Sequence, residues 1–153
     1  MKHITAPRDG DIEHVAHHMR ANDAKECEAL GFTPLQALSD SVKYSLRSYT
    51  LLDHQEAPVA MLGVGRGIIP EWGMIWLLGT KGIEENPMTF LRHSPPVLQR
   101  LFKETGKDVL YNYTHVNNEL HHKWLKWLGF KFIRRTEYGP YNELFYEFTR
   151  MRG

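Results

Sequence analysis

The chain has 153 residues, a formal net charge of +1 and a hydrophobic share of 42 %. These values fit a single folded domain and exclude a disordered chain or a strongly basic nucleic-acid binder. The lone cysteine, Cys27, excludes an internal disulfide and favours a reducing compartment. There is no apolar leader, and the longest hydrophobic run (74–78) is far too short to span a bilayer. We therefore expect a cytoplasmic protein that binds neither nucleic acid nor membranes.

The first third of the chain predicts a short strand followed by three helices. The strand covers 3–6, and Asp9 is the expected N-cap of a helix whose apolar residues recur at helical spacing as far as Met19. Two further helices are expected, one over 22–30 and one over 34–43, the latter opened by Thr33 with proline at its first position.

The period then changes to that of strands. Two runs, 49–52 and 59–64, flank a turn and predict an antiparallel hairpin, and 72–78 is apolar on both faces, as expected of a buried central strand. A long loop is expected over 79–93, after which Ser94-Pro95-Pro96 should open a helix. The remaining predicted elements are a strand over 109–116, a helix over 118–127, and strands over 130–136 and 143–149. This order predicts a mixed α/β sheet with a parallel crossover in its second half.

The segment from Asn118 to Phe130 resembles the GNAT acyltransferase superfamily, in which an asparagine opens a helix that ends in Leu-Gly-Phe. The order of predicted elements also matches over nearly the full chain. The runs 76–80, 89–92 and 124–130 look like the small GNAT-like proteins of podovirus-type tailed phages. The resemblance implies six to seven strands, with the fourth and fifth splayed apart, and four to five helices.

The resemblance also implies acetyl-CoA as cosubstrate, entering the gap between the fourth and fifth strands. Its pantetheine amides would pair with the backbone of the fourth strand, and its pyrophosphate would lie at the N-terminus of the following helix, where free amides and the helix dipole attract anions. The residues that would hold acetyl-CoA on this basis are Leu77, Leu78, Gly79, Thr80, Arg92, Ser94 and Asn118.

Two features depart from the GNAT pattern. The phosphate loop of the family, Arg/Gln-x-x-Gly-x-Gly/Ala, has no match over 80–93, where Gly82 is the only glycine and Glu84 and Glu85 would repel pyrophosphate if they pointed inward. The tyrosine that many members use as a general acid falls at Leu125, which has no proton to give. Another group would then have to donate the proton: Tyr113, His115, His121 or a water molecule.

Three residues are candidates for the chemistry. Glu71 precedes the fourth strand, where several GNAT members place a general base, and the alternative is an exposed loop carboxylate. His115 lies near the end of the fifth strand, and histidine is the residue type suited to proton relay; Tyr113 shares its face by period two. Both can equally be structural residues of that strand. No metal site is expected, because His14, His17 and His18 share a helix face without a second ligand cluster.

Two functions stay open at this point. The first is an acyl-CoA-dependent N-acetyltransferase of phage type that acts on a host protein or a small amine. The alternative is a catalytically degenerate GNAT-fold protein that works by protein–protein contact, as a virion component or as a modulator of a host enzyme. A phage origin would place the protein in the host cytoplasm or in the virion, and the aromatic residues near the C-terminal hairpin favour a homodimer.

Overall fold

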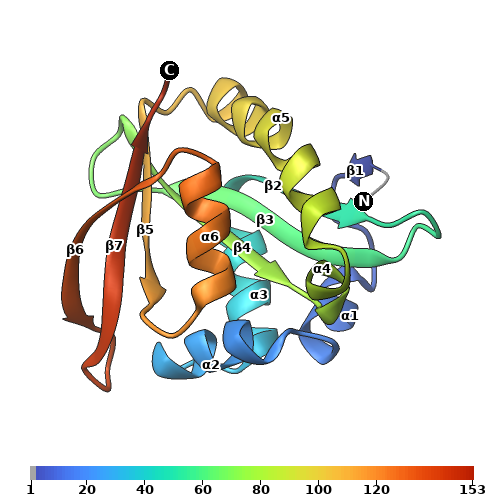
Figure 1. Ribbon diagram of the computed structural model, residues 1–153. Helices are drawn as coiled ribbons and strands as arrows, with labels where there is room; N and C mark the ends of the chain where they lie inside the picture. The colour runs from blue at the N-terminus through green and yellow to red at the C-terminus, as the bar shows by residue number, and fades with distance from the viewer. Residues whose placement is uncertain (1–2) are drawn as a thin grey trace.

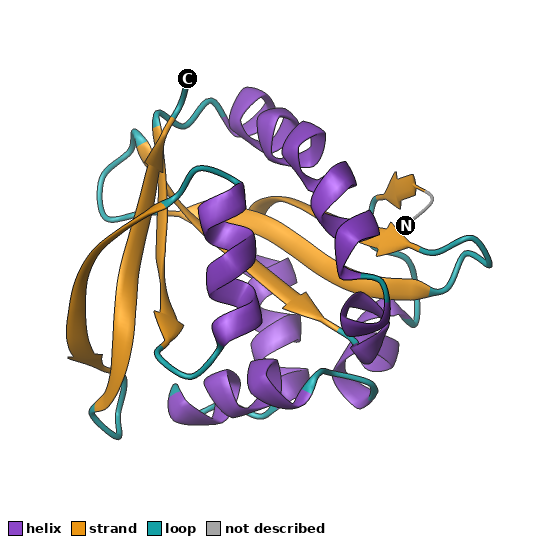
Figure 2. Ribbon diagram, in the orientation of Figure 1, coloured by secondary structure: helices purple, strands orange, loops and turns teal. Residues whose placement is uncertain are grey.

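The computed structural model describes residues 3–153, which build one mixed sheet with helices on both faces (Figures 1 and 2). The strands are β1 His3–Thr5, β2 Ser45–Leu52, β3 Pro58–Arg66, β4 Trp72–Gly79, β5 Val109–His115, β6 Lys131–Tyr138 and β7 Glu143–Met151. The helices are α1 Asp11–His17, α2 Ala21–Ala29, α3 Pro34–Tyr44, α4 Lys81–Glu85, α5 Pro87–Thr105 and α6 Glu119–Trp127.

The strand order in the sheet is β1-β2-β3-β4-β5-β7-β6. Neighbouring strands are antiparallel throughout this order except for β4 and β5, which run parallel. A parallel pair needs a long crossover, and α4 and α5 supply it. The predicted mixed α/β sheet with its parallel crossover in the second half is confirmed, as is the expected number of strands.

The sheet separates two hydrophobic clusters. Ile75 belongs to the larger one, which it shares with residues of α5 and α6 such as Leu98 and Trp124. Leu78 belongs to the smaller one, with Val15 of α1 and Leu38 of α3. Because successive side chains of a strand point to opposite faces, β4 contributes to both clusters and is buried from both sides. None of the helices in the described part of the chain is long and apolar enough to cross a membrane.

The expectation of a loop over 79–93 and a helix opening at Ser94 is wrong. Instead α4 and α5 occupy the segment, and α5 begins at Pro87 and continues through both Pro95 and Pro96. A proline inside a helix leaves the carbonyl four residues earlier without a donor. For Pro95 that carbonyl is Leu91, which instead accepts from Ser94 Oγ and Trp127 Nε1, each at 3.0 Å. These side-chain donors allow the helix to continue, which raises the count of helices to six among residues 3–153.

Two predicted helix starts are also corrected. The N-cap of α1 is Gly10, in the left-handed region at φ 88°, and not Asp9. Helix α2 is capped at Arg20, two residues before the expected start. The start of α3 is confirmed, because Thr33 and Gln36 form a reciprocal capping box with proline at the first helical positions.

Candidate active site

Strands β4 and β5 are paired only where they begin. The register joins Trp72 to Val109, Gly73 to Leu110 and Met74 to Tyr111, and no ladder pair follows among the described residues. At the next position the side-chain amide of Asn112 donates to the carbonyl of Ile75 at 2.7 Å. The strands then diverge, so the splay that the resemblance implies is present in the fold.

A cavity of about 240 Å³ occupies the gap between the diverging strands. Four consecutive β4 residues, 75–78, line it. Because these side chains alternate between the two faces, the cavity passes through the sheet. It is lined on one face by residues of α5 and α6, among them Phe90, Ser94 and Leu125, and on the other face by residues of α2 and α3.

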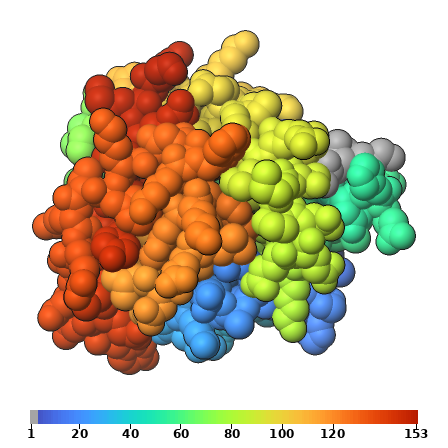
Figure 3. Space-filling model, viewed as in Figure 1, coloured from blue at the N-terminus to red at the C-terminus, as the bar shows by residue number. Residues whose placement is uncertain are grey.

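Helices α5 and α6 roof the cavity on one face of the sheet. Figure 3 shows the side chains of α5 and α6 meeting over this face. The rings of Phe90 and Trp124 have centroids 4.6 Å apart, and Trp127 Nε1 donates to the Leu91 carbonyl. Trp124 also lines the cavity, and its indole Nε1 is buried without a hydrogen-bond partner among residues 3–153. Such an unpaired donor costs free energy unless a bound group accepts from it.

The diverging ends of the strands are tied to α2 by side chains. Asp23 Oδ2 accepts from the Gly79 amide at 2.9 Å, and the Arg20 amide donates to the Gly79 carbonyl at 2.9 Å. On the other strand, the amide of His115 donates to the Glu26 carboxylate. These bonds replace the ladder that the splay removes, which agrees with the rule that buried backbone groups are paired.

These side chains belong to a buried network that we call the α2 cluster, made of Arg20, Asp23, Glu26, Asn118 and His121. Arg20 is only 1 % exposed; its Nη1 lies 2.5 Å from Asp23 Oδ1, and its guanidinium lies over Trp124. Arg20 Nε also pairs with Glu84 at 3.0 Å, so this carboxylate has a cationic partner. A buried guanidinium is tolerated because it is paired and hydrogen-bonded on several sides.

Asn118 occupies the N-cap position of α6, but its side chain forms no cap hydrogen bond. Its amide oxygen accepts from Arg20, and its amide nitrogen donates to Asp23 at 3.0 Å and to Glu26 at 3.4 Å. It therefore joins α6 to α2 at the open end of the strand gap. The sequence predicted that Asn118 caps the helix; its side chain instead binds the α2 cluster, which explains why an asparagine stands there.

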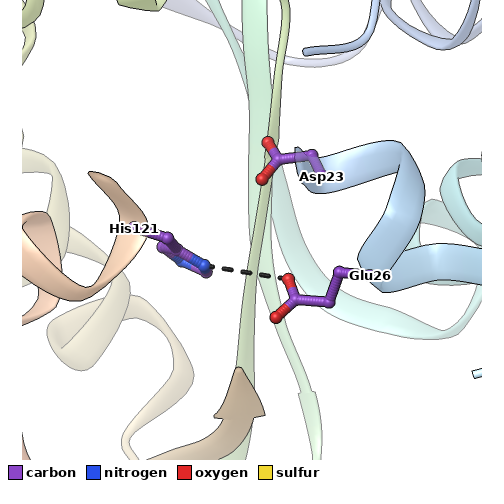
Figure 4. A group of neighbouring side chains, drawn as sticks. All are labelled: Asp23, Glu26 and His121. Atoms are coloured by element: carbon purple, nitrogen blue, oxygen red, sulfur yellow. Dashed lines mark ion pairs between the residues drawn. The ribbon is translucent and has the colours of Figure 1, made fainter. Parts of the chain in front are cut away.

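The protonation of the cluster is set mainly by burial. Burial, followed by the nearby charge of Asp23, raises the pKa of Glu26 to about 7. Burial, followed by the Arg20 charge, lowers the pKa of His121 to about 3. Figure 4 shows His121 on α6 facing Glu26 on α2, with Nδ1 and Oε2 3.8 Å apart. Near neutral pH, His121 is therefore uncharged, and Glu26 can gain or lose a proton.

Asp23, Glu26 and His121 also have the separations of a metal-binding group. Asp23, however, already uses one oxygen for Arg20 and Asn118 and the other for the Gly79 amide. The Arg20 guanidinium supplies the positive charge that a cation would bring. These three side chains consequently do not fit a metal ion. We interpret them as a group that stabilises the gap and that can accept and release a proton.

The structure brings some of the predicted site residues together at the cavity. Leu77, Leu78, Ser94 and Tyr113 line it. Ser94 lies within α5, so the idea that its amide opens a helix is wrong, although its side chain reaches the cavity region. The ring of Tyr113 is stacked on Tyr138 with centroids 3.9 Å apart.

Other predicted residues lie elsewhere. Glu71 is exposed at the paired end of β4, and Arg92 is exposed on α5. His115 lies near the end of β5, but its ring is engaged with Glu143 at 2.8 Å and with the Asn117 amide at 3.1 Å. Thr80 donates to the Val59 carbonyl and caps α4 through the amide of Gly82. None of these four side chains lines the cavity.

Sequence reasoning missed most of the α2 cluster. Arg20, Asp23 and Glu26 recur at helical spacing, and this signal places them on one face, but charged residues on a helix usually face solvent. Cys27 follows them in the cavity wall, and burial, ahead of the nearby Glu26 and Asp23 charges, raises the pKa of its thiol to about 12. The thiol therefore stays protonated, in agreement with the absence of any reactive context in the sequence.

No protein-family model matches the chain, and neither does any curated protein sequence. Solved structures do match. A GNAT-family acetyltransferase from Bacillus anthracis aligns with a TM-score of 0.72 at 11 % identity, covering 97 % of this chain and 93 % of that one. An aminoglycoside 6'-acetyltransferase type Ii aligns with a TM-score of 0.71 at 12 % identity, covering 97 % and 96 %.

A third similar structure is the spermidine N-acetyltransferase from Vibrio cholerae in complex with CoA and spermine. Its TM-score is 0.67 at 12 % identity, and the alignment covers 97 % of this chain and 94 % of that one. At this level of identity, the likeness establishes the fold and leaves activity to be argued from the site. The chain has the GNAT fold.

Proposed function

We propose that the protein is an acyl-CoA-dependent N-acyltransferase that transfers an acetyl group to an amine. The observation that carries this proposal is the cavity that crosses the sheet where β4 and β5 diverge. A cavity that reaches both faces of the sheet would let an acyl donor and an amine meet between the strands. Holding the two reacting groups together in this way is the main contribution that such a site makes to the rate.

The gap has the groups needed to hold the extended arm of acetyl-CoA, which supplies a thioester-bound acetyl group. Ile75 and Gly79 direct backbone groups toward β5, since they bond to Asn112 and Asp23. Leu77 lies midway between them and has the same orientation, so its N–H and C=O face the gap. The unpaired Nε1 of Trp124 is a further donor in the cavity wall.

The phosphates of acetyl-CoA would have to bind without the glycine-containing phosphate loop that is typical of GNAT proteins. The chain offers the N-terminus of α5, a helix of 19 residues whose N-cap residue, Asn86, forms no side-chain cap bond. Free amides and the helix dipole favour an anion there. Arg92 lies in the second turn of the same helix and is exposed.

Glu26 is the residue best placed to accept a proton from the acceptor ammonium. It lines the cavity, and its raised pKa lies close to neutral pH, where a general base is most effective. Loss of this proton leaves the amine with a lone pair that can attack the thioester carbon, after which the carbon–sulfur bond breaks. Tyr113 in the cavity wall would give a proton to the departing thiolate, because Leu125 cannot.

The proposal is tested by calorimetry with acetyl-CoA and by amine-dependent release of the CoA thiol. We expect binding, thiol release, and a loss of roughly 10²-fold or more in kcat for Glu26→Gln. Glu28→Gln is the matched control, because Glu28 lies on the same helix but is exposed. Absence of acetyl-CoA binding at millimolar ligand would exclude the enzyme.

The second candidate is a GNAT-fold protein that acts by protein contact. Two observations favour it: α4 stands where the phosphate loop is expected, and Ile68 and Ile69 are exposed side by side between β3 and β4. Thiol release that depends on an amine and is lost in Glu26→Gln would exclude this candidate. A phage origin, a host target and a place in a virion stay predictions for either role.

A further inference from the structure

We propose that the acceptor is a monoamine whose amino group is attached to an apolar body, and not a polycation. This inference rests on the proposed function, since it concerns the half of the same cavity that faces α2 and α3. The residues that line this half are Cys27, Leu30, Phe32, Ala37, Asp40, Ser41 and Trp76. Most of them are apolar, and the polar ones are Asp40 and Ser41 on α3.

The apolar wall is held in place by the surrounding structure. Trp76 Nε1 donates to Ser45 Oγ at 2.8 Å, which fixes the indole against the end of α3. Phe32 is anchored through its amide, which donates to the Cys27 carbonyl at 3.0 Å, while the residue as a whole is 44 % exposed. An aromatic ring that is partly exposed at the edge of a cavity can cover an apolar group as it enters.

The charges of the cavity suit one ammonium group. Glu26 is the carboxylate inside, and Asp40 is the exposed carboxylate on α3. Asp23 is already paired with Arg20, and Arg20 is paired with Glu84 as well, so neither carboxylate is available to a substrate ammonium. A second ammonium could pair with Asp40 at the exposed edge, but each one beyond that would lose its hydration without gaining a partner.

Two kinds of molecule carry an amino group on an apolar body: a free amine, and a peptide whose first residue is large and apolar. The experiment therefore compares 2-phenylethylamine, the peptide Phe-Gly-Gly, ethylamine and spermidine as acceptors in the thiol-release assay. We expect kcat/KM for phenylethylamine, for Phe-Gly-Gly, or for both to exceed that for spermidine at least tenfold. The ratio of the first two identifies the source.

Phe32→Ala tests the wall itself. Phe32 is partly exposed, so the variant should fold, and we expect it to raise KM for the aromatic acceptors while KM for ethylamine changes little. Ile68→Ala is the matched control, since Ile68 is 77 % exposed and does not line the cavity. A preference for spermidine, or equal effects of Phe32→Ala on ethylamine and phenylethylamine, would overturn the inference and leave the proposed function standing.

Calorimetry with phenylethylamine alone separates the two proposals. Binding that weakens in Phe32→Ala, without any thiol release, would support the apolar amine site and refute the transferase. Neither binding nor thiol release would refute both.

Discussion

The backbone groups at the two ends of the β4–β5 pair find their hydrogen-bond partners in different ways. Where the strands begin, backbone groups pair in a regular parallel ladder, and the Glu71 carbonyl accepts from Asp108. Where the strands end, Asp23, Glu26 and Asn112 provide the partners instead. Side chains can therefore replace most of the ladder where a sheet opens, which here leaves the backbone of Leu77 facing the gap.

The replacement has an energetic consequence. A ladder is made of neutral groups, whereas the splayed end depends on buried charged groups, which are held only while every partner is present. The stability of the splayed end should therefore respond strongly to single substitutions and to pH. The paired end should respond to neither.

The largest effect is expected from Arg20→Met. This change leaves Asp23 buried without its guanidinium partner, and we expect a loss of about 3–5 kcal/mol in the free energy of unfolding. Urea denaturation measures it. Arg100→Met is the control, because Arg100 forms its ion pair with Glu104 on the exposed face of α5 and should change the urea midpoint little. Similar midpoints for the two variants would show that the α2 cluster does not support the gap.

The second largest effect is expected in how the free energy of unfolding depends on pH. The pKa of Glu26 is raised to about 7, so the folded state binds this proton more tightly than the unfolded state. Its contribution to stability is complete below pH 4.5 and is lost as the pH rises through 7. We expect the stability of Glu26→Gln, relative to wild type, to increase by roughly 2.5 kcal/mol between pH 5 and pH 8.

The stability of the variant has to be compared with that of wild type at each pH, because protonation of His121 changes the stability in the opposite direction. Its lowered pKa makes the folded state lose stability as the pH falls below about 6.5. Denaturation at several pH values gives both curves, and Glu28→Gln, at an exposed position of the same helix, is the matched control. Parallel curves for Glu26→Gln would contradict the account.

A smaller effect is expected from Asn112→Ala, which removes the one side-chain bond from β5 to the Ile75 carbonyl. Loss of this bond should cost about 1 kcal/mol, measured by denaturation. Asn117→Ala, at an exposed position beyond β5, is the control. Equal stabilities of the two variants would mean that Asn112 does not hold the strands where the ladder ends.

The smallest effect on stability should come from Trp127→Phe. The variant loses the bond to the Leu91 carbonyl, which still accepts from Ser94, so we expect a loss of no more than about 0.5–1 kcal/mol. Because this bond joins α5 to α6 over the cavity, acetyl-CoA should bind faster to the variant. Stopped-flow binding measures the rate, and an unchanged association rate would show that the roof does not limit entry.

Much of the architecture could be predicted from the sequence. The apolar run of β4, the helical crossover and the segment from Asn118 to Phe130 predicted the sheet and its splay. The continuation of α5 through Pro95 could not be predicted, because the donor that helps to satisfy the Leu91 carbonyl comes from Trp127 in another helix. A prediction from the residues next to a proline cannot take account of a hydrogen-bond donor from another helix.

The candidate site was predicted less completely. Of the candidate residues, Leu77, Leu78 and Tyr113 line the cavity, whereas Glu71 and His115 do not. The α2 cluster was hidden because burial of Arg20 depends on partners far away in the sequence, at Glu84 and Asn118. Helical spacing identifies a shared face but does not show whether that face is buried.

The central claim is that an acyl-CoA arm enters the gap and pairs with β4. Amide hydrogen exchange with and without acetyl-CoA tests it most directly, by comparing Leu77, whose amide faces the gap, with Leu78, whose amide faces β3. We expect acetyl-CoA to slow exchange at Leu77 and to leave exchange at Leu78 unchanged. Binding of acetyl-CoA with unaltered exchange at Leu77 would contradict it.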